Sequence, residues 1–360
     1  MVRPTVLLGM SGGVDSSVAA ALLVRQGYEV HGITLQVWEH EDETAAASKK
    51  WQERGCCKIG IAKYVAKTLQ ISHEVIDARE TFRRGVIDDF LEGYAGGTTP
   101  NPCVRCNERV KIKELIDLAR SRCIRHVATG HYVRLHANNG ASVLARSADL
   151  KKDQSYFLYR LDPEWLPQLL FPLGDMQKSA VWREAEALGL PTEEMKESQE
   201  ICFVSHGDYR TFIETERPEA NKPGPFIDET GQYLGRHDGI AFYTPGQRRG
   251  LKIAAGERLY VHRVQPSTNT VFLGREESLR RASCDVSDLN LFRPSLLSEP
   301  TEALVKVRYA TPATPVTLFP LSPSSLRIRF HESQRALSPG QSAVFYENDV
   351  VLGGGIIQAD

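Results

Sequence analysis

A predicted strand, a loop rich in glycine and serine, and a predicted helix follow one another at the start of the chain, and this junction constrains the fold most. Residues 5–8 (TVLL) are mostly apolar and lie between Pro4 and Gly9, which predicts a short buried strand. From Val14 onward small apolar residues recur at helical spacing and end at Gly27, a typical helix stop. The loop between them therefore lies where helix N–H groups lack partners and the helix dipole is positive.

The composition of this loop (GMSGGVDS, residues 9–16) predicts a phosphate-binding site. Glycines let the backbone approach a ligand closely, and hydroxyl groups add hydrogen-bond donors. Neither common motif fits, because the loop has no lysine for G-x-x-x-x-G-K-[ST] and residues 9–13 do not match G-x-G-x-x-G. The competing interpretation is an ordinary glycine-rich turn in which a serine or aspartate caps the helix.

Predicted strands and helices alternate through the first half of the chain. The strands are residues 28–37, 73–77 and 124–128, and the helices are 57–69, 81–94 and 111–120, with further helical segments around 155–160 and 179–188. This alternation predicts an α/β fold, a doubly wound parallel sheet with helices on both faces. Ligands bind such sheets at the carboxyl ends of the strands, where the first loop, Leu35 and Gly130 all fall. Residues 138–140 (NNG) predict a hairpin turn between two further strands.

The pattern changes after about residue 205. Turn signals such as residues 223–225 (PGP) and 245–246 (PG) interrupt short β-like runs, and from about residue 280 the chain alternates short strands and turns. Short strands at regular spacing indicate a small barrel or sandwich. We therefore predict three domains: residues 1–205, a small β-rich central domain at 206–279, and a C-terminal β domain at 280–360.

The totals exclude some classes of protein. With 44 basic and 45 acidic residues, the net charge of −1 neither supports nor excludes a nucleic-acid partner, which would need a local basic patch. No apolar run is long enough to span a membrane, and only four residues precede the first predicted strand, so we expect a cytoplasmic protein without a signal peptide. Seven cysteines in such a protein indicate catalysis or metal binding more than structural disulfides.

Three of the cysteines stand out. Cys103 and Cys106 form a C-x-x-C pair at a predicted helix start, where the dipole and the nearby Arg105 and Arg109 would lower the thiol pKa. Cys202 lies in the segment SQEICF. By itself the pair fits half a zinc site, a redox pair or helix packing, and no second C-x-x-C or well-spaced histidine pair completes a zinc site.

Eight motifs in order carry a family resemblance that runs from the first strand to the last. They are SGGVDSS, NPCVRCN, GHY (130–132), KDQSYFL (152–158), SQEICF, TPGQRRGL (244–251), RY (308–309) and PGQ-x-x-VFY (339–346). In this order they resemble the bacterial tRNA-specific 2-thiouridylases (the MnmA family), a group of ATP-pyrophosphatase, or PP-loop, enzymes. The resemblance implies a PP-loop α/β domain of the adenine-nucleotide alpha-hydrolase type, followed by a central domain and a C-terminal β-barrel. It also implies a cytoplasmic transferase that uses ATP and Mg²⁺ to convert the wobble uridine of tRNA to 2-thiouridine.

The resemblance assigns roles to individual residues. ATP binding is implied for Gly9, Met10, Ser11, Gly12, Gly13, Val14, Asp15, Ser16, Leu35 and Gly130, with Asp15 near the metal. Contact with the target base is implied for Asn101, Pro102 and Cys103, and contact with tRNA for His131, Lys152, Asp153, Gln154, Arg308, Tyr309 and Gln341. Without the motif, His131 is equally well an ordinary loop histidine with a local hydrogen bond.

The implied chemistry needs two of the thiols. A uracil carbonyl is a poor electrophile, and transfer of AMP to its oxygen creates a good leaving group that sulfur can displace. By resemblance, Cys202 carries a persulfide received from a persulfide-carrying donor protein; free sulfide is the alternative sulfur donor, which fits the iron–sulfur route below. Cys106 attacks the persulfide as nucleophile, which leaves a transient Cys106–Cys202 disulfide that is then reduced.

Cys103 departs from the pattern, because many relatives carry aspartate at its position. It is then either a spare thiol or one ligand of a three-thiolate site with Cys106 and Cys202, similar to the [4Fe-4S] clusters of iron–sulfur tRNA thiolases. Two other classes of protein stay open on the residues alone. One is a ligase that adenylates a small molecule, which would not need Cys106 and Cys202, and the other is a redox- or metal-sensing RNA-binding protein, which would not explain the phosphate loop.

Overall fold

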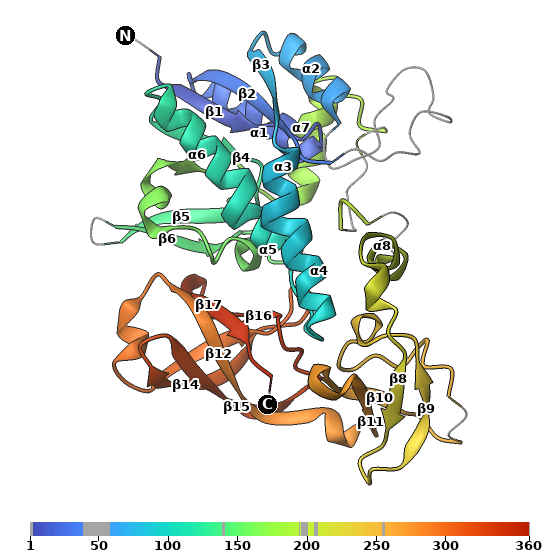
Figure 1. Ribbon diagram of the computed structural model, residues 1–360. Coiled ribbons are helices and arrows are strands. Elements are labelled where there is room, and N and C mark those ends of the chain that lie inside the picture. The colour runs from blue at the N-terminus through green and yellow to red at the C-terminus, as the bar shows by residue number, and fades with distance from the viewer. Residues whose placement is uncertain are drawn as a thin grey trace. The chain divides into compact units, whose positions relative to one another are not determined.

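The computed structural model describes residues 3–38, 58–138, 141–193, 195, 201–204, 208–253 and 256–359. The chain divides into two compact units (Figure 1). The first unit comprises Met1–Val86, Cys103–Phe203 and Asp349–Val351, and the second comprises Ile87–Pro102, Val204–Asn348 and Leu352–Asp360. The chain therefore passes between the units more than once.

A five-stranded parallel sheet forms the centre of the first unit, in the order β3-β2-β1-β4-β7. Its strands are β1 (Thr5–Gly9), β2 (Glu29–Gln36), β3 (Ser72–Asp77), β4 (His126–Thr129) and β7 (Leu169–Leu170). β1 pairs in parallel with β2 on one side and with β4 on the other. The predicted doubly wound sheet is confirmed, and the point where the strand order reverses lies between β1 and β4.

Helices cover both faces of this sheet. Val6 and Leu8 of β1 share a buried cluster with α1 (Val14–Arg25), α2 (Ile59–Thr68) and α7 (Lys178–Ala187). The alternate residues point the other way, because a Cβ at Gly9 would meet Leu115 of α6 (Ile112–Ser121) at 2.9 Å. Burial on both faces explains why β1 is apolar along its whole length.

Two predicted helices are longer and less regular than expected. Residues 79–95 form α3 (Arg79–Phe82), a π-helical turn (Arg83–Ile87) and α4 (Asp88–Ala95). The helix predicted at residues 111–120 instead begins at α5 (Pro102–Cys106), and a second π-helical turn (Asn107–Lys111) leads into α6. The second π-helical turn directly follows the cysteine pair, and the first lies against the helix that carries the pair.

One local prediction is confirmed, and two local features differ from expectation. The hairpin of β5 (Val133–Asn138) and β6 (Ala141–Arg146) is confirmed, although residues 139 and 140 of its turn lie outside the described residues. The helix predicted around 155–160 is reduced to a 3₁₀ turn, Ser155–Phe157. The helix α8 (Tyr209–Glu216), capped by Asp208, was not predicted.

The second unit holds a four-stranded sheet in the order β10-β11-β8-β9. Its strands are β8 (Gly224–Ile227), β9 (Tyr233–His237), β10 (Tyr260–Gln265) and β11 (Thr270–Gly274). Helix α8 packs on α4 through Tyr209, whose ring stacks on Tyr94 at 5.0 Å, and through Phe212, whose ring lies 6.2 Å from Phe90.

Six antiparallel strands complete the second unit: β12 (Arg280–Leu291), β13 (Thr301–Lys306), β14 (Thr314–Ser322), β15 (Ser325–Arg335), β16 (Ser342–Glu347) and β17 (Val350–Ile357). They follow the order β12-β15-β14-β13-β16-β17, and β12 also pairs with β17. This last pairing closes a barrel around a core that includes Val316, Ile328 and Phe345, and confirms the predicted C-terminal barrel. In the part of the chain that the structure describes, none of the helices is both long and apolar enough to cross a membrane.

Candidate active site

The predicted phosphate loop leaves β1 at the carboxyl edge of the sheet and enters α1. Gly13, which has no side chain to cap the helix, is the N-cap residue of α1. Inside the loop, the Ser16 hydroxyl donates to the Gly13 carbonyl oxygen at 3.1 Å, and the Ser11 N–H donates to Ser16 Oγ at 3.2 Å. The Ser16 side chain thus holds the loop in one conformation at the positive end of the α1 dipole.

Glycine is required at two positions around the loop. Gly12 has φ +74°, and a Cβ there would meet the Lys58 carbonyl oxygen at 2.2 Å. Gly130 follows β4, and a Cβ there would meet the backbone N of Ser16 at 2.7 Å and the carbonyl carbon of Asp15 at 2.8 Å. The structure therefore brings Gly130 against the phosphate loop, where the sequence expected it.

Asp15, in the first turn of α1, is held by two side chains from other parts of the first unit. Lys178 Nζ donates to Asp15 Oδ1 at 2.7 Å and to Oδ2 at 2.8 Å, and the Tyr132 hydroxyl donates to Oδ1 at 2.7 Å. Lys178 is only 8% exposed. The loop thus carries a carboxylate that is already neutralised by a buried ammonium group.

A polar contact joins the loop to the neighbouring strands. Thr34 of β2 donates from Oγ1 to the Met10 carbonyl oxygen at 2.7 Å and contacts His73 Nε2 at 2.8 Å. Burial, together with the charge of Lys63, lowers the pKa of His73. Leu35 is buried one residue later on β2, also near the carboxyl edge of the sheet. The residues predicted to surround ATP therefore occupy one edge of one sheet.

The donor set of the loop fits Mg²⁺. Mg²⁺ is usually held by one or two carboxylates, with phosphate and water oxygens completing the shell, and Asp15 supplies such a carboxylate beside the serine hydroxyls. Across the described segments, no three His, Cys, Asp or Glu side chains gather into a metal site. This finding covers the three possible ligands of an iron–sulfur cluster. Cys103, Cys106 and Cys202 all lie among the described residues, and all three are thiols.

The cysteine pair lies in the first turns of a continuous helical segment, Pro102–Ser121. Cys103 is exposed, whereas Cys106 is 5% exposed. Asn107 donates from Nδ2 to the Cys103 carbonyl oxygen at 3.1 Å, within the helix that carries both thiols. The helix N-terminus thus presents one accessible and one buried thiol.

The two arginines near the pair are partly neutralised. Glu108 accepts from Arg105 Nη1 at 3.0 Å and from Arg160 Nε at 2.8 Å, and Arg109 donates from Nη1 to the Gly85 carbonyl oxygen at 3.2 Å. The negative charge of Glu108 therefore offsets part of the positive charge that these arginines place near the cysteine pair.

Cys202 reaches the same part of the first unit through its neighbour Phe203. Phe203 is 1% exposed, and its ring lies 5.7 Å from Phe82 of α3 and 6.4 Å from Trp38. The π-helical turn after α3 contains Gly85, which accepts the hydrogen bond from Arg109 described above. One helical segment, residues 79–87, thus contacts both the Cys106 helix and the segment that carries Cys202.

The residues of the first unit expected to contact tRNA have structural partners. Burial and the charge of Lys111 lower the pKa of His131 to about 3, and its Nδ1 lies 2.7 Å from Thr129 Oγ1. Asp153 is 4% exposed and accepts from the Ser147 and Ser155 N–H groups, while Gln154 Oε1 accepts from the Tyr132 N–H at 2.9 Å. Lys152 is half-buried and donates from its N–H to the Asp149 carbonyl oxygen at 3.0 Å. Their role toward tRNA stays a prediction.

The remaining predicted contacts lie in the second unit. Arg308 donates from Nη2 to the Ala336 carbonyl oxygen at 2.7 Å, and the Lys306 ammonium lies 5.3 Å above the Tyr309 ring. Gln341 donates from Nε2 to the Thr99 carbonyl oxygen at 2.8 Å. Gln341 therefore holds the segment that leads into Asn101 and Pro102, the residues predicted to face the target base.

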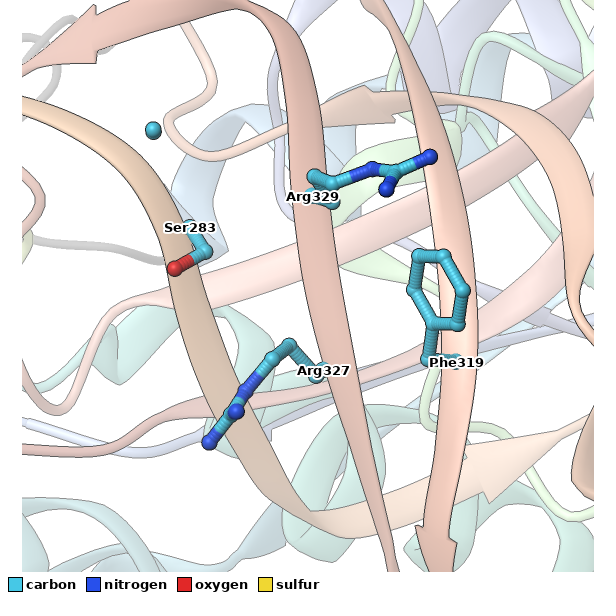
Figure 2. Close-up of a pocket in the computed structure, with 5 residues that line it drawn as sticks. Ser283, Phe319, Arg327 and Arg329 are labelled. Atoms are coloured by element: carbon cyan, nitrogen blue, oxygen red, sulfur yellow. The ribbon is translucent and has the colours of Figure 1, made fainter.

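A shallow pocket on the barrel belongs to the second unit. It is lined by Ala282, Ser283, Phe319, Arg327 and Arg329 (Figure 2). Arg327 is paired with Asp285 at 2.7 Å, and the Arg329 guanidinium lies 4.9 Å from the Phe319 ring centroid. None of these five residues was among the predicted site residues.

Sequence reasoning missed Lys178 and Tyr132 as partners of the phosphate loop. Tyr132 belongs to the GHY segment, a motif that by itself assigns no role to the tyrosine hydroxyl. Lys178 has no local signal, because a single lysine at a helix start is normally a solvated residue. Only the fold brings it to Asp15, 163 positions away.

Comparison with protein families divides the chain into three matches. Residues 4–206 match the family described as "tRNA methyl transferase HUP domain", residues 210–275 match "tRNA methyl transferase PRC-barrel domain", and residues 281–357 match "Aminomethyltransferase beta-barrel domain". The first match covers more than half of the chain and contains the phosphate loop and all three cysteines discussed above.

Similar proteins cover the whole chain. A protein of Pelotomaculum thermopropionicum named "tRNA-specific 2-thiouridylase MnmA" is 45% identical over 100% of this chain and 98% of its own length. One of Acetivibrio thermocellus with the same name is 42% identical over 99% of this chain and 100% of its own length. A solved structure, that of NMN synthetase from Francisella tularensis, covers 59% of this chain and 71% of its own at 18% identity, with a TM-score of 0.35 that carries no argument.

Proposed function

The chain belongs to the family of the tRNA-specific 2-thiouridylases, and on this premise we propose that it is an ATP-dependent tRNA-uridine 2-sulfurtransferase that replaces the C2 oxygen of the wobble uridine with sulfur. The relatives are named as 2-thiouridylases, and they match this chain over nearly their full length. The methyl transfer that two of the family descriptions mention is therefore not assigned to this chain. The observation that supports the proposal best is the phosphate loop, which opens at the N-terminus of α1 and against which Gly130 packs.

The first proposed step is transfer of AMP from ATP to the C2 oxygen of the uridine, with release of pyrophosphate. The backbone of residues 9–16 and the α1 dipole would stabilise the negative charge of the phosphates. Gly130 and Leu35 would border the nucleotide at the same sheet edge. Asn101, Pro102 and Cys103 would face the base that receives AMP.

Mg²⁺, when bound, would neutralise phosphate charge and orient the phosphate oxygens. Asp15 would hold it, together with the serine hydroxyls of the loop. Because both Asp15 oxygens accept hydrogen bonds from Lys178, the carboxylate keeps one orientation before the metal arrives.

The second proposed step is sulfur transfer. The terminal sulfur of a Cys202 persulfide attacks C2, and AMP leaves with the former C2 oxygen. The Cys106 thiolate then attacks the Cys202 sulfur, so that the S–S bond breaks, the thiocarbonyl of 2-thiouridine is released and a Cys106–Cys202 disulfide forms. Because the Cys106 thiol is buried, this step includes an opening of the first turns of its helix. An external dithiol or reductase restores both thiols.

The alternative route has Cys103, Cys106 and Cys202 as three ligands of a [4Fe-4S] cluster, and it would require the three thiols to move together, because the described residues do not gather them into a metal site. Iron and acid-labile sulfide, measured on protein purified without oxygen, separate the two routes. The persulfide route predicts neither in appreciable amount, in the wild type or in Cys103→Ser. Iron and sulfide near four each per chain, both lost in Cys103→Ser, would replace it with the cluster route.

We further propose how the parts divide the work. Residues 1–205 would hold ATP, the base and the reacting sulfur, whereas the central domain (206–279) and the C-terminal barrel (280–360) would hold the tRNA in the cytoplasm. A persulfide-carrying donor protein would supply the sulfur on the persulfide route, and sulfide would supply it on the cluster route. Arginines on the barrel, such as Arg329 beside Phe319, suit contact with phosphates or bases.

Product analysis tests the proposed chemistry. An unmodified tRNA transcript is incubated with the protein, ATP labelled at the α-phosphate, Mg²⁺, a sulfur donor and a dithiol. We expect AMP, pyrophosphate and 2-thiouridine in equal amounts from the wild type. Cys202→Ser should form no 2-thiouridine and should stop after the first step, with pyrophosphate released and the labelled AMP retained on the tRNA. ADP and phosphate as products, or adenylation without tRNA, would contradict the proposal and favour another kind of ATP-dependent enzyme.

A further inference from the structure

Lys178 is a buried cation with an unusual position. It is the first residue of α7, where the helix dipole is positive and a positive side chain is unfavourable. The Lys178 ammonium lies 5.4 Å from the Tyr132 ring centroid and 5.5 Å from that of Trp182. The backbone N–H of Lys178 donates to Asp149 Oδ2 at 2.9 Å. Burial of an ammonium group costs several kcal/mol unless the group is paired. The stability of α7 therefore does not explain why a lysine occupies this position.

Asp15, the partner of Lys178, belongs to the phosphate loop and lies in the first turn of α1. Lys178 reaches both oxygens of Asp15, at 2.7 and 2.8 Å, and the Asp15 side chain is 33% exposed whereas that of Lys178 is 10% exposed. The carboxylate is therefore the more solvent-accessible member of the pair, and the ammonium is the buried member. An unpaired carboxylate at this place would repel the polyphosphate of a nucleotide.

We propose that Lys178 is a positioning residue of the phosphate loop, which neutralises and orients Asp15 so that the loop accepts the triphosphate of ATP. This inference rests on the proposed function, because it takes the ligand of the loop to be ATP. Lys178 acts through Asp15. Removal of the Lys178 charge should therefore weaken nucleotide binding, and removal of the Asp15 charge should strengthen it. Removal of both charges should restore the affinity.

A double-mutant cycle on nucleotide binding tests this coupling. The probe is α,β-methylene-ATP, titrated calorimetrically into the full chain in buffer with a chelator, where Asp15 cannot act through a metal. We expect Lys178→Met to weaken binding by about tenfold or more, because Asp15 is then an unpaired charge beside the phosphates. We expect Asp15→Asn to strengthen it by about threefold or more, because the ammonium is then available to the phosphates. The double variant should return to within about threefold of the wild type.

The controls separate the outcomes. Lys151→Met, which removes an exposed lysine whose N–H donates to Asp149, should leave affinity unchanged. Equal affinity of Lys178→Met and wild type, or a double variant as weak as Lys178→Met, would overturn the inference while leaving the proposed function intact. If Lys178→Met does not fold, the Asp15→Asn variant decides, and unchanged or weaker metal-free binding overturns the inference. A wild type that fails to bind the analogue even with Mg²⁺ would overturn the proposed function and this inference with it.

Discussion

Gly130 is the single residue whose replacement tests the phosphate loop most simply. An alanine Cβ would lie 2.7 Å from the Ser16 nitrogen and 2.8 Å from the Asp15 carbonyl carbon, and backbone atoms at the start of α1 cannot move without disturbing the loop. We expect Gly130→Ala to weaken binding of α,β-methylene-ATP by about tenfold or more, which corresponds to about 1.4 kcal/mol. Calorimetric titration in Mg²⁺ buffer measures this change.

Gly27→Ala is the matched control. Gly27 has φ +88°, and among the described residues beyond its chain neighbours no atom lies within 4 Å of the place that an alanine methyl group would take. Alanine there adds backbone strain of about 1 kcal/mol without touching the loop. It should lower the free energy of unfolding and leave nucleotide affinity as it is. Equal affinity of Gly130→Ala and the wild type would show that the loop does not hold the nucleotide.

His131 provides a pH prediction at the same scale. Its pKa of about 3 lies below that of an ordinary histidine near 6.5, so between these values the unfolded state binds the proton and the folded state does not. His131 therefore contributes a loss of stability as the pH falls from about 6.5 toward 3. Denaturant unfolding at pH 7 and 4.5 should show a smaller acid loss for His131→Gln than for the wild type. His136→Gln, at an exposed position of β5, serves as the control, and equal acid losses in both variants would contradict the assignment.

Single residues were predictable where a motif is short and local. The loop and Gly130 follow from glycine and serine at a strand end, because backbone sterics and helix N–H groups act within a few residues. Lys178 could not be predicted, because its contact with Asp15 depends on how α7 packs beside α1.

At the scale of elements, Phe203 links the Cys202 segment to α3. Truncation to alanine removes a 1% exposed ring from between Phe82 and Trp38 and should cost about 3–5 kcal/mol locally. We expect Phe203→Ala to lower the rate of thiolation more than tenfold, to increase the labelling of Cys202 by a thiol reagent, and to leave nucleotide affinity unchanged. Peptide mass spectrometry identifies the labelled cysteine. Phe203→Leu should retain most of the rate, and a Phe203→Ala variant as active as wild type would contradict the role of this anchor.

The elements themselves were predicted best where hydrophobic periodicity is strong. β1, β2, β4, α1 and α7 agree with expectation within a few residues, because each buries apolar residues. β3 agrees as well, although none of its residues is fully buried. The two π-helical turns were not predicted, since a π turn changes the hydrogen-bond pattern without changing the composition. The 3₁₀ turn at Ser155–Phe157 replaced a predicted helix because Asp153 accepts from the Ser155 N–H and hydroxyl, which fixes the chain locally.

At the scale of the whole molecule, the balance of charge shapes how tRNA should bind. With 44 basic and 45 acidic residues, attraction to tRNA must come from local groups of arginine and lysine. We expect the affinity for tRNA to fall steeply with salt, with a log–log slope of about −0.7 to −0.9 for each phosphate contact. Filter binding over a range of KCl concentrations measures the slope. Affinity that does not depend on salt would contradict phosphate contacts from the central domain and barrel.

The architecture was predictable from the order of patterns along the chain. Alternating strands and helices predicted the parallel sheet, and short strands between turns predicted a barrel or a sandwich, because each pattern has few stable solutions. The family resemblance favoured the barrel over the sandwich. The entry of residues 87–102 into the second unit was not predictable, because it depends on contacts such as Tyr94 with Tyr209.

The nucleoside content of tRNA tests the central claim most directly. tRNA from cells that lack the protein is digested and analysed by liquid chromatography and mass spectrometry, alongside tRNA from the same cells supplied with the wild type or with Cys106→Ser. We predict that 2-thiouridine derivatives disappear in the first case, return with the wild type and stay absent with Cys106→Ser. An unchanged 2-thiouridine profile in cells that lack the protein would contradict the account.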